Sequence, residues 1–426
     1  MKMEELYQIY QQYPLVQTDT RKLKNGDLYF ALQGPSFNGN TFAAQALEKG
    51  AAYAIVDEAQ YHVSDRTILV DDVLQTLQDL ALYHRQQFTI PFLAITGSNG
   101  KTTTKELIHA VLSTTYKTYT TEGNLNNHIG VPLTLLKIKS DAEMAVIEMG
   151  ANHQKEIESY CRIALPTHGL ITNCGKAHLE GFGGEEGVRK GKGELFDFLR
   201  SHNGTAFIMA DYDYLHQMSQ GIQEVISYGT GNAKVSGTVS QSDPFLEVTF
   251  KQGISGKVKT QLVGSYNLPN VLASVAVGSF FGVTEENIKM ALENYIPSNS
   301  RSQLVEKGTN KIILDAYNAN PSSMKAAIEN FARTESKNKI LVLGAMAELG
   351  DESLDEHKAI VGEISRHPWQ QVLLVGGDFL KTDHPYHSFS TPESAGEWLR
   401  ESGVADAYLL IKGSRSMQME KVLNYI

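Results

Sequence analysis

The sequence has little cysteine, no excess of positive charge and no long apolar run, and each shortage excludes a class of protein. Its 426 residues include two cysteines, Cys161 and Cys174, which form no close metal or redox motif, so we expect reduced thiols. The formal net charge is -10, which argues against nucleic acid as a partner. No apolar run is long enough to cross a membrane, and none follows residues 1–5. We therefore expect a cytoplasmic protein with neither a signal peptide nor membrane insertion.

The length and the order of apolar segments predict an α/β protein of about three domains. Residues 1–87 are expected to form a small mixed α/β domain, with strands at 27–32 and 53–56 and a helix at 41–50. Residues 88–297 should form a central domain on a parallel sheet, flanked by a β-rich stretch at 224–263. In residues 298–426, four apolar runs alternate with helical stretches, which predicts a Rossmann-like domain.

The most informative stretch is a glycine-rich loop between an apolar strand candidate and an amphipathic helix. It consists of Gly97, Ser98, Asn99, Gly100, Lys101, Thr102 and Thr103. The two glycines let the backbone turn and present N–H groups to phosphate, and the helix N-terminus adds partial positive charge. Lys101 can reach the terminal phosphates and the Thr102 hydroxyl can hold magnesium.

This loop therefore predicts ATP binding, although its glycines stand closer together than in the usual phosphate loop. The usual spacing places four residues between the glycines, whereas this chain places two. The competing interpretation is a glycine-rich turn that binds no nucleotide.

Two further residues follow strand candidates of the central domain and should lie at the same edge of its sheet. Glu148 ends the strand candidate at 145–147, and His178 stands in the loop after the strand candidate at 169–172. A carboxylate and a neutral imidazole are both metal ligands, so we expect them near the magnesium. Taken singly, a carboxylate at a strand end and a histidine in a loop are more often simply solvated.

Motifs along the whole chain resemble those of the Mur ligase family, the ATP-dependent amide-bond ligases of peptidoglycan synthesis. The matching segments are residues 19–21, 26–32, 38–42, 95–104, 124–134, 148–150, 175–180, 315–321, 343–350 and 412–417. The segment 315–321, Asp-Ala-Tyr-Asn-Ala-Asn-Pro, is the most specific of them. Any one motif is weak, but their shared order along three domains makes the resemblance strong.

The resemblance implies an ATP- and Mg²⁺-dependent ligase that joins D-Ala-D-Ala to UDP-MurNAc-tripeptide through an acyl phosphate. It implies sugar-nucleotide and substrate contacts at Thr20, Arg21, Asn38, Gly39, Asn40, Thr41 and Asn127. It implies nucleotide contacts at Asn267, Asn270, Arg301, Asp315, Tyr317 and Asn318. Catalytic roles fall to Lys101, His178 and Lys192, and metal contacts to Thr102, Glu148, His178 and Lys192.

Lys192 matches, by its spacing to Leu195 and Phe196, the family's lysine that is carbamylated. A neutral lysine can add CO₂, and the resulting anion can help place a second magnesium ion. Taken alone, Lys192 is an ordinary solvated lysine near a helix start.

Departures from the family pattern occur at Leu314, where a second aspartate is usual, at His128 and at Tyr266. They bear on fine contacts and leave the reaction class unchanged. Three alternatives stay open: a folylpolyglutamate synthetase of the same superfamily, a P-loop small-molecule kinase and a nucleotide-regulated binding protein. The sequence leaves open whether the third residue of the peptide is meso-diaminopimelate or lysine, and it does not indicate the oligomeric state.

Overall fold

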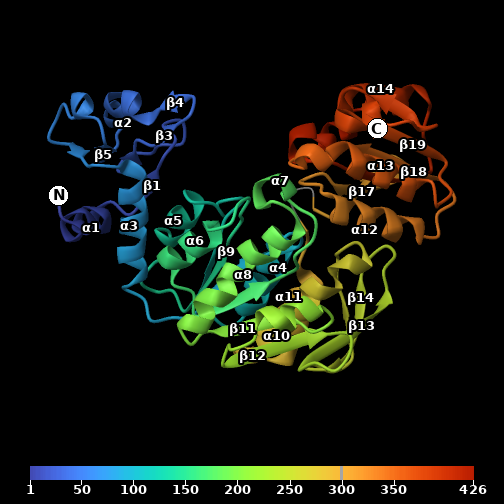
Figure 1. Ribbon diagram of the computed structural model, residues 1–426, viewed down its shortest axis with the longest axis horizontal. Coiled ribbons are helices and arrows are strands. Elements are labelled where there is room, and N and C mark those ends of the chain that lie inside the picture. Colours follow the sequence, from blue (N-terminus) through green and yellow to red (C-terminus); the bar gives the residue numbers. More distant parts are fainter. Residues whose placement is uncertain (298–300) are drawn as a thin grey trace.

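The structure is a computed structural model that describes residues 1–297 and 301–426. The chain forms three bodies, with the N-terminal and C-terminal parts standing on either side of the central part (Figure 1). The predicted boundary between the central and C-terminal parts, at residue 298, lies outside the described residues. Within the described ranges, no helix combines the length and the apolar composition that a membrane span requires.

The N-terminal part is a four-stranded parallel sheet in the order β1-β2-β5-β6. Its elements are α1 (Met3–Gln12), β1 (Val16–Gln17), β2 (Leu28–Phe30), β3 (Gln33–Gly34), β4 (Phe37–Asn38), η1 (Gly39–Phe42), α2 (Ala43–Glu48), β5 (Tyr53–Val56), η2 (Ala59–Tyr61), β6 (Thr67–Leu69) and α3 (Val73–Arg85). The predicted strands correspond to β2 and β5. The predicted helix at 41–50 is shorter, because the chain first makes the 3₁₀ turn η1, in which the Asn38 side chain accepts a bond from the Asn40 N–H.

The central part is built on a nine-stranded sheet in the order β15-β14-β13-β12-β11-β10-β7-β9-β8. Its elements are β7 (Phe92–Thr96), α4 (Lys101–Leu112), β8 (Thr118–Thr120), α5 (Gly130–Leu135), β9 (Met144–Glu148), α6 (Glu156–Ala164), β10 (His168–Ile171), α7 (Leu179–Phe182), α8 (Glu185–Ser201), β11 (Thr205–Met209), α9 (Asp213–Met218), β12 (Glu224–Gly229), β13 (Val235–Gln241), β14 (Glu247–Gln252), β15 (Lys257–Lys259), η3 (Ser265–Asn267), α10 (Leu268–Phe280) and α11 (Glu285–Asn294). The strands from β7 to β13 all pair in parallel, whereas β14 pairs antiparallel with β13 and β15 pairs antiparallel with β14. The predicted β-rich flank is thus the outer end of this sheet.

The C-terminal part is a six-stranded sheet in the order β16-β17-β21-β18-β19-β20, parallel except for β16. Its elements are β16 (Gln303–Lys307), β17 (Asn310–Asp315), α12 (Pro321–Ala332), β18 (Lys339–Gly344), η4 (Gly350–Glu352), α13 (Ser353–Ile364), β19 (Gln371–Val375), η5 (Gly377–Lys381), β20 (His387–Phe389), α14 (Pro392–Glu401), β21 (Tyr408–Lys412), η6 (Arg415–Met417) and η7 (Met419–Asn424). Two apolar clusters cover the two faces of this sheet. Strands that are buried on both faces are apolar throughout, which explains the four apolar runs of the sequence.

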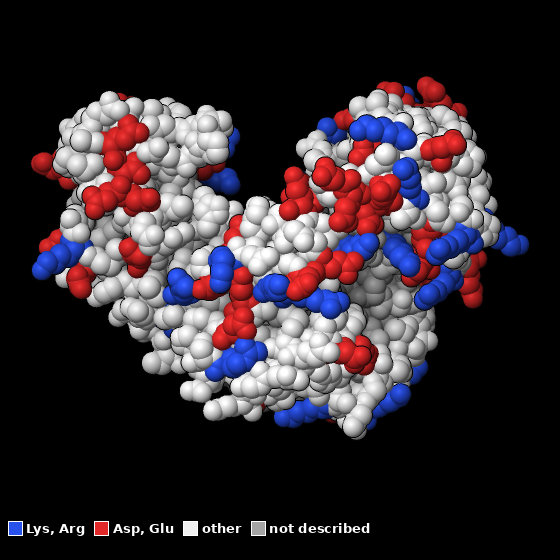
Figure 2. All heavy atoms as spheres, viewed as in Figure 1, with Lys and Arg blue, Asp and Glu red and all other residues white. Residues whose placement is uncertain are grey.

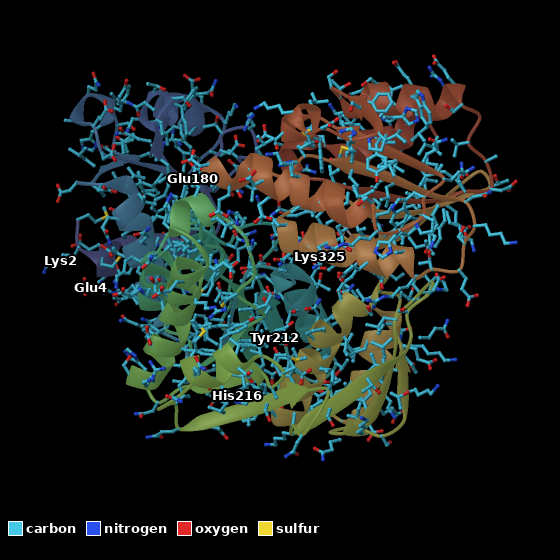
Figure 3. All side chains as sticks on the ribbon, turned by 45° about the vertical axis from the view of Figure 1, so that its right-hand side comes forward. Lys2, Glu4, Glu180, Tyr212, His216 and Lys325 are labelled. Carbon is cyan, nitrogen blue, oxygen red and sulfur yellow. The ribbon has the colours of Figure 1, made fainter. Side chains whose placement is uncertain are left out.

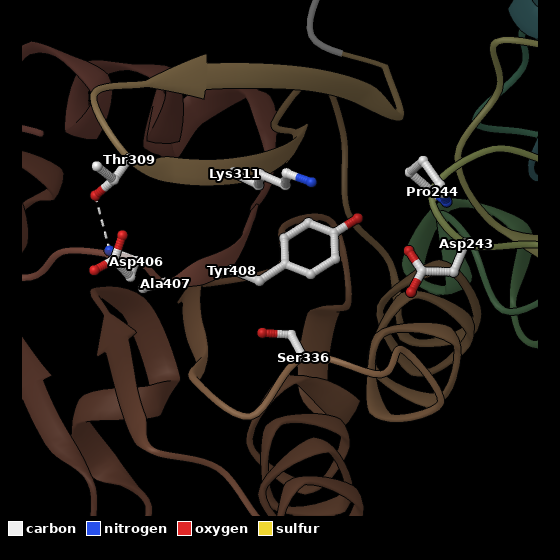
Figure 4. A pocket seen from close by; sticks show the side chains of 8 residues that line it. All are labelled: Asp243, Pro244, Thr309, Lys311, Ser336, Asp406, Ala407 and Tyr408. Atoms are coloured by element: carbon white, nitrogen blue, oxygen red, sulfur yellow. Dashed lines mark hydrogen bonds between the residues drawn. The ribbon is translucent and has the colours of Figure 1, made fainter.

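The space between the N-terminal and C-terminal parts is an open hollow above the central part (Figure 2). A second hollow, of about 430 Å³, lies between the β13–β14 connection and the C-terminal sheet (Figure 4). Its lining includes Lys311 and Tyr408, which stand near the amino ends of β17 and β21. The carboxyl ends of the same two strands face the candidate functional site, so the two cavities lie at opposite ends of the sheet.

Candidate functional site

A cavity of about 730 Å³ lies where the carboxyl ends of the central strands meet the C-terminal part. Parallel registers place Ile95 of β7 beside Glu148 of β9, and Thr96 beside Ile171 of β10, so three strands end together. The predicted residues that line this cavity are Ser98, Asn99, Gly100, Lys101, Thr102, Thr103, Asn127, Glu148, His178, Asn267, Asn270, Arg301, Asp315, Tyr317 and Asn318. Residues far apart in the sequence therefore share one site.

The glycine-rich loop joins β7 to α4, and its two glycines are there for steric reasons. Gly97 has φ 141°, and a Cβ there would lie 2.0 Å from Thr172 Oγ1. Gly100 has φ 81°, and a Cβ there would lie 2.6 Å from Asn270 Oδ1. Both positions require a residue without a side chain, because any side chain would strain the turn and strike a neighbouring polar group.

Hydrogen bonds from the strand β10 side fix the loop in place. The Ser98 N–H donates to the Asn173 carbonyl oxygen at 2.8 Å, and the Asn99 N–H donates to Asn173 Oδ1 at 3.1 Å. Lys101 Nζ donates to the carbonyl oxygens of Gly97, at 2.7 Å, and Ser98, at 3.3 Å. Burial lowers the pKa of Lys101, against the opposing effect of the Glu148 carboxylate. The lysine thus lies folded over the loop that would receive the phosphates.

Thr102 and Glu148, which the sequence predicts as metal contacts, lie against each other at the edge of the central sheet. Thr102 Oγ1 donates to Glu148 Oε1 at 3.1 Å, and Asn126 Nδ2 donates to the same oxygen at 2.8 Å. Glu148 is 1 % exposed, and its Oε2 has no hydrogen-bond partner among the described residues. A buried carboxylate oxygen without a partner is costly in a protein, and it fits a hard cation such as Mg²⁺.

His178 lines the same cavity but is paired with an unpredicted partner. Its Nδ1 lies 2.6 Å from Oε2 of Glu348 in the C-terminal part, and this contact lowers the pKa of Glu348. No group of three or more His, Cys, Asp or Glu side chains surrounds a common metal position in the part of the chain that is described. Metal binding by His178 therefore stays a prediction.

Lys192 is not the solvated lysine of the simpler interpretation. It lies on α8 with 1 % of its surface exposed, and its Nζ donates to the Ala151 carbonyl oxygen at 2.8 Å. The Phe182 ring lies 4.7 Å from that nitrogen. Burial lowers the pKa of Lys192 to about 7, and the positive charge of Lys101 contributes. By contrast, exposed Lys190 pairs with Glu186 on the surface, at 2.9 Å.

The C-terminal part contributes side chains from the ends of β17 and β21. Lys412 Nζ forms an ion pair with Asp315, and the Arg301 guanidinium lies 3.7 Å from the centre of the Tyr317 ring. The α7 helix, which carries Glu180 in Figure 3, reaches the C-terminal part near Gly350. The predicted residues Asp315, Tyr317 and Asn318 line the same cavity as the glycine-rich loop.

Asn267 is the N-cap residue of α10 and Asn270 lies in its first turn, but the Asn267 side chain makes no capping hydrogen bond. Asn267 Nδ2 donates to the Val263 carbonyl oxygen at 2.9 Å, and Asn270 Nδ2 donates to Asn267 Oδ1 at 2.8 Å. Thr104 Oγ1 of α4 donates to Asn270 Oδ1 at 3.0 Å. The pair thus ties α10 to the helix that follows the phosphate loop.

Most predicted substrate contacts belong to the N-terminal part and do not line the central cavity. Asn40 is buried and binds Asp57, and exposed Arg21 pairs with Asp19 at 2.9 Å, whereas Asn127 lines the cavity. The remaining predicted residues, Thr20, Asn38, Gly39 and Thr41, lie in the same N-terminal loops. Their role in substrate binding stays a prediction.

Several polar residues of the site were not predicted. Asn126 and Glu348 stand inside the matched motifs, and Asn173 lies two residues after the end of β10, so the sequence position of each pointed to the site. At the departure Tyr266, the phenol oxygen lies 3.0 Å from Ser302 Oγ, which connects the central part to the start of the C-terminal part.

Comparison with known proteins assigns each part of the chain. Family models match at residues 12–85 (Mur ligase family, catalytic domain), 95–278 (Mur ligase middle domain) and 300–415 (Mur ligase, glutamate ligase domain). The UDP-N-acetylmuramoyl-tripeptide–D-alanyl-D-alanine ligase of Bacillus subtilis is 35% identical over 422 residues, which cover 96% of this chain and 92% of that protein.

Two solved structures resemble this one over nearly their full length. A MurF from Acinetobacter baumannii superposes with a TM-score of 0.89 at 30% identity, covering 99% of this chain and 98% of that one. A MurF ligase from Thermotoga maritima, solved in complex with ADP, gives a TM-score of 0.86 at 26% identity, with 97% of each chain covered.

Proposed function

The chain belongs to the Mur ligase family, and we infer from this premise that it joins D-Ala-D-Ala to UDP-MurNAc-tripeptide with ATP, in peptidoglycan synthesis. The observation that carries this conclusion is the full-length match to ligases of that specificity. The cavity agrees with it, because the phosphate loop, the Glu148 edge and the C-terminal segment at 315–318 surround one space. The cavity can hold the ATP phosphates and the reacting groups together.

The chemistry explains why these groups must meet. A carboxylate oxygen is a poor leaving group, so the peptide carboxylate first attacks the γ-phosphorus of ATP, which gives an acyl phosphate and ADP. The amine of D-Ala-D-Ala then attacks the acyl carbon, loses a proton and expels phosphate as the amide forms. Loop N–H groups and Lys101 stabilise charge that develops on the phosphoryl oxygens. Closure of the three parts would exclude water from the acyl phosphate.

Magnesium belongs to this proposal because Thr102 and Glu148 fit it. The hydroxyl and the partnerless carboxylate oxygen are oxygen donors of the kind that Mg²⁺ prefers, and His178 is the proposed further contact. When bound, the ion would neutralise charge on the β- and γ-phosphate oxygens. Substitution of Glu148 or His178 should raise the magnesium requirement and lower kcat.

A carbamate on Lys192 is the second part of the proposal. Its lowered pKa leaves a large fraction of neutral amine near pH 7. That amine adds CO₂ to give a carbamate and releases one proton. The product is an anion at a buried position where the positive charge of Lys101 is felt, and it would help to place a second magnesium ion.

The substrates would occupy separate surfaces. We assign the UDP group to the loops around Asn38 and Arg21, and the peptide terminus to the side of the cavity lined by Asn127. A reaction that uses ATP and a nucleotide-linked precursor suits a cytoplasmic location, which is part of the same proposal.

One coupled assay tests the proposed function against its alternatives. Phosphate release should require both UDP-MurNAc-tripeptide and D-Ala-D-Ala, and mass spectrometry should find the UDP-MurNAc-pentapeptide. Phosphoryl transfer without an amine would indicate a kinase. Activity with a folate and glutamate in place of these substrates would indicate a folylpolyglutamate synthetase, and binding without turnover would indicate a regulatory protein.

A further inference from the structure

Two side chains of α4 hold the edge strand β8 at both of its ends. His109 Nε2 lies 3.2 Å from the Thr118 carbonyl oxygen, at the start of the strand. Lys105 Nζ donates a 2.7 Å hydrogen bond to the carbonyl oxygen of Thr121, directly after the strand. Residues four apart share one face of a helix, so both contacts come from the same side of α4.

Lys105 is unusual because its charged group lies inside the protein. The residue is 2 % exposed. Among the described residues, its ammonium has one ion-pair partner, the Glu106 carboxylate at 3.8 Å, in addition to the hydrogen bond to Thr121. Burying an ammonium is costly, and leucine or methionine would fill the same space without that cost. The buried position of Lys105 is therefore better explained by its hydrogen bond to the Thr121 carbonyl oxygen than by packing.

Thr121 transmits this contact to Glu148. It is fully buried, its N–H donates to the Val146 carbonyl oxygen at 3.2 Å, and its Oγ1 accepts from the Glu148 N–H at 2.9 Å. Thr121 thus binds β9 on both sides of Ile147, at the point where Glu148 leaves the strand. The Glu148 backbone, and with it the origin of the side chain, is held by Thr121.

Helix α4 therefore contacts Glu148 in two ways, directly through Thr102 and indirectly through Lys105 and Thr121. Thr102, one turn before Lys105 on α4, donates to Glu148 Oε1 at 3.1 Å, while Lys105 reaches the same glutamate through Thr121. We propose that Lys105 is a positioning residue, which holds Thr121 so that Oε2 of Glu148 faces the magnesium ion of bound ATP. This inference rests on the proposed function, in which Glu148 holds that ion.

The test measures how magnesium changes the affinity for a non-hydrolysable ATP analogue, by calorimetry, first in EDTA and then over a series of Mg²⁺ concentrations. In Lys105→Met, the Mg²⁺ concentration for half-maximal tightening should rise about tenfold, the usual effect of losing an outer-shell contact. Affinity in EDTA should stay within about twofold of wild type, because the phosphate loop is untouched.

Substitutions at Thr121 separate positioning from packing. Thr121→Val removes the acceptor of the Glu148 N–H and should reproduce the magnesium defect, whereas Thr121→Ser keeps the hydroxyl and should bind Mg²⁺ like wild type. The double variant Lys105→Met/Thr121→Val should be no worse than either single variant, because both act on Glu148 through Thr121. If Lys105→Met fails to fold, Lys105→Gln takes its place in the same titration, because the Thr121 variants leave the bond from Lys105 intact.

Lys339→Met is the matched control. Lys339 also donates to backbone carbonyl oxygens, those of Ala332 at 2.6 Å and Thr334 at 3.0 Å, but in the C-terminal part. It should lose stability and keep the wild-type magnesium response. Equal weakening of Lys105→Met in EDTA and in Mg²⁺, or no change at all, would overturn the role of Lys105. If Mg²⁺ does not change the affinity of the wild-type protein for the ATP analogue, the proposed magnesium site is wrong, and so is this inference.

Discussion

Asn320 of the C-terminal part donates a 2.8 Å hydrogen bond from its Nδ2 to Oδ1 of Asn99 in the phosphate loop. The same side chain caps α12, because its Oδ1 accepts from the Ser323 N–H at 2.9 Å. One residue therefore starts a helix of one domain and contacts the nucleotide loop of another. We therefore expect binding of ATP at the loop to depend on the position of the C-terminal part.

This double role can be separated by substitution. Asn320→Ser keeps a good N-cap but is too short to reach Asn99, so KM for ATP should rise several-fold with little loss of stability. Asn320→Ala should show the same KM effect and also lose about 1 kcal/mol of stability with the cap. Steady-state kinetics and urea melts check both. An unchanged KM in the Ser variant would show that the contact is irrelevant to ATP.

Arg301 should affect ATP more than the sugar-nucleotide substrate. Its guanidinium lies over the Tyr317 ring in the cavity, on the side of the C-terminal part. We expect Arg301→Ala to raise KM for ATP far more than KM for UDP-MurNAc-tripeptide. Initial rates with each substrate varied in turn give the comparison, and equal effects on both would indicate a general folding defect.

Loss of the loop lysine should stop the reaction. Lys101→Ala removes the loop cation that we propose stabilises charge on the transferred phosphoryl group, so kcat/KM should fall on the order of 10³-fold or more. The exposed lysine Lys139 provides the control, and Lys139→Ala should keep full activity. Circular dichroism should show both variants folded. A folded, fully active Lys101→Ala protein would remove the loop from the mechanism.

Acid stability should depend on His168. Burial against Phe280 and Phe281 lowers its pKa from 6.5 to about 4. The neutral ring is favoured in the folded state, so this contribution is complete above pH 6.5 and is lost as the pH falls towards 4. The difference between the pKa values of the unfolded and folded states corresponds to about 3 kcal/mol of the free energy of unfolding. About 2 kcal/mol of this is lost between pH 7 and pH 5.

Urea melts at those two pH values test this directly. His168→Gln should lose less stability than wild type on acidification, even if it is less stable at pH 7. His202→Gln, which replaces an exposed ring, should retain the wild-type slope. Equal slopes in the His168 variant and wild type would contradict the assignment.

The parts of the site that are local in sequence were predictable, and those that depend on tertiary packing were not. Strand, glycine loop and helix lie within about twenty residues, so the loop and the Thr102 hydroxyl could be placed from spacing alone. Glu148 was found because strand ends converge at one edge of a parallel sheet.

The burial of Lys192, by contrast, depends on α8 packing against the loop that carries Ala151. The sequence suggested a helix start with a solvated side chain there, whereas Lys192 lies in the middle of α8. The contact of Asn320 with Asn99 spans 221 residues, and no local pattern encodes it. The same holds for Lys105, since its partner Thr121 is defined only when β8 lies beside α4.

The carbamate gives the sharpest prediction, because its chemistry differs from that of every ordinary lysine. Lys192→Ala should be nearly inactive and partly rescued by short carboxylates such as formate or acetate, which restore an anion near the metal position. Lys190→Ala, two residues earlier on the exposed face, should remain active.

A readout without turnover makes the carbamate test independent of activity. Carbon-13 NMR of the wild-type protein supplied with ¹³CO₂ should show one carbamate signal that Lys192→Ala lacks and Lys190→Ala keeps. The signal should weaken as the pH falls, because protonation removes the neutral amine that adds CO₂. A wild-type protein that is active with magnesium but shows no such signal, and electron density ending in a plain ammonium, would refute the carbamate while leaving the ligase assignment intact.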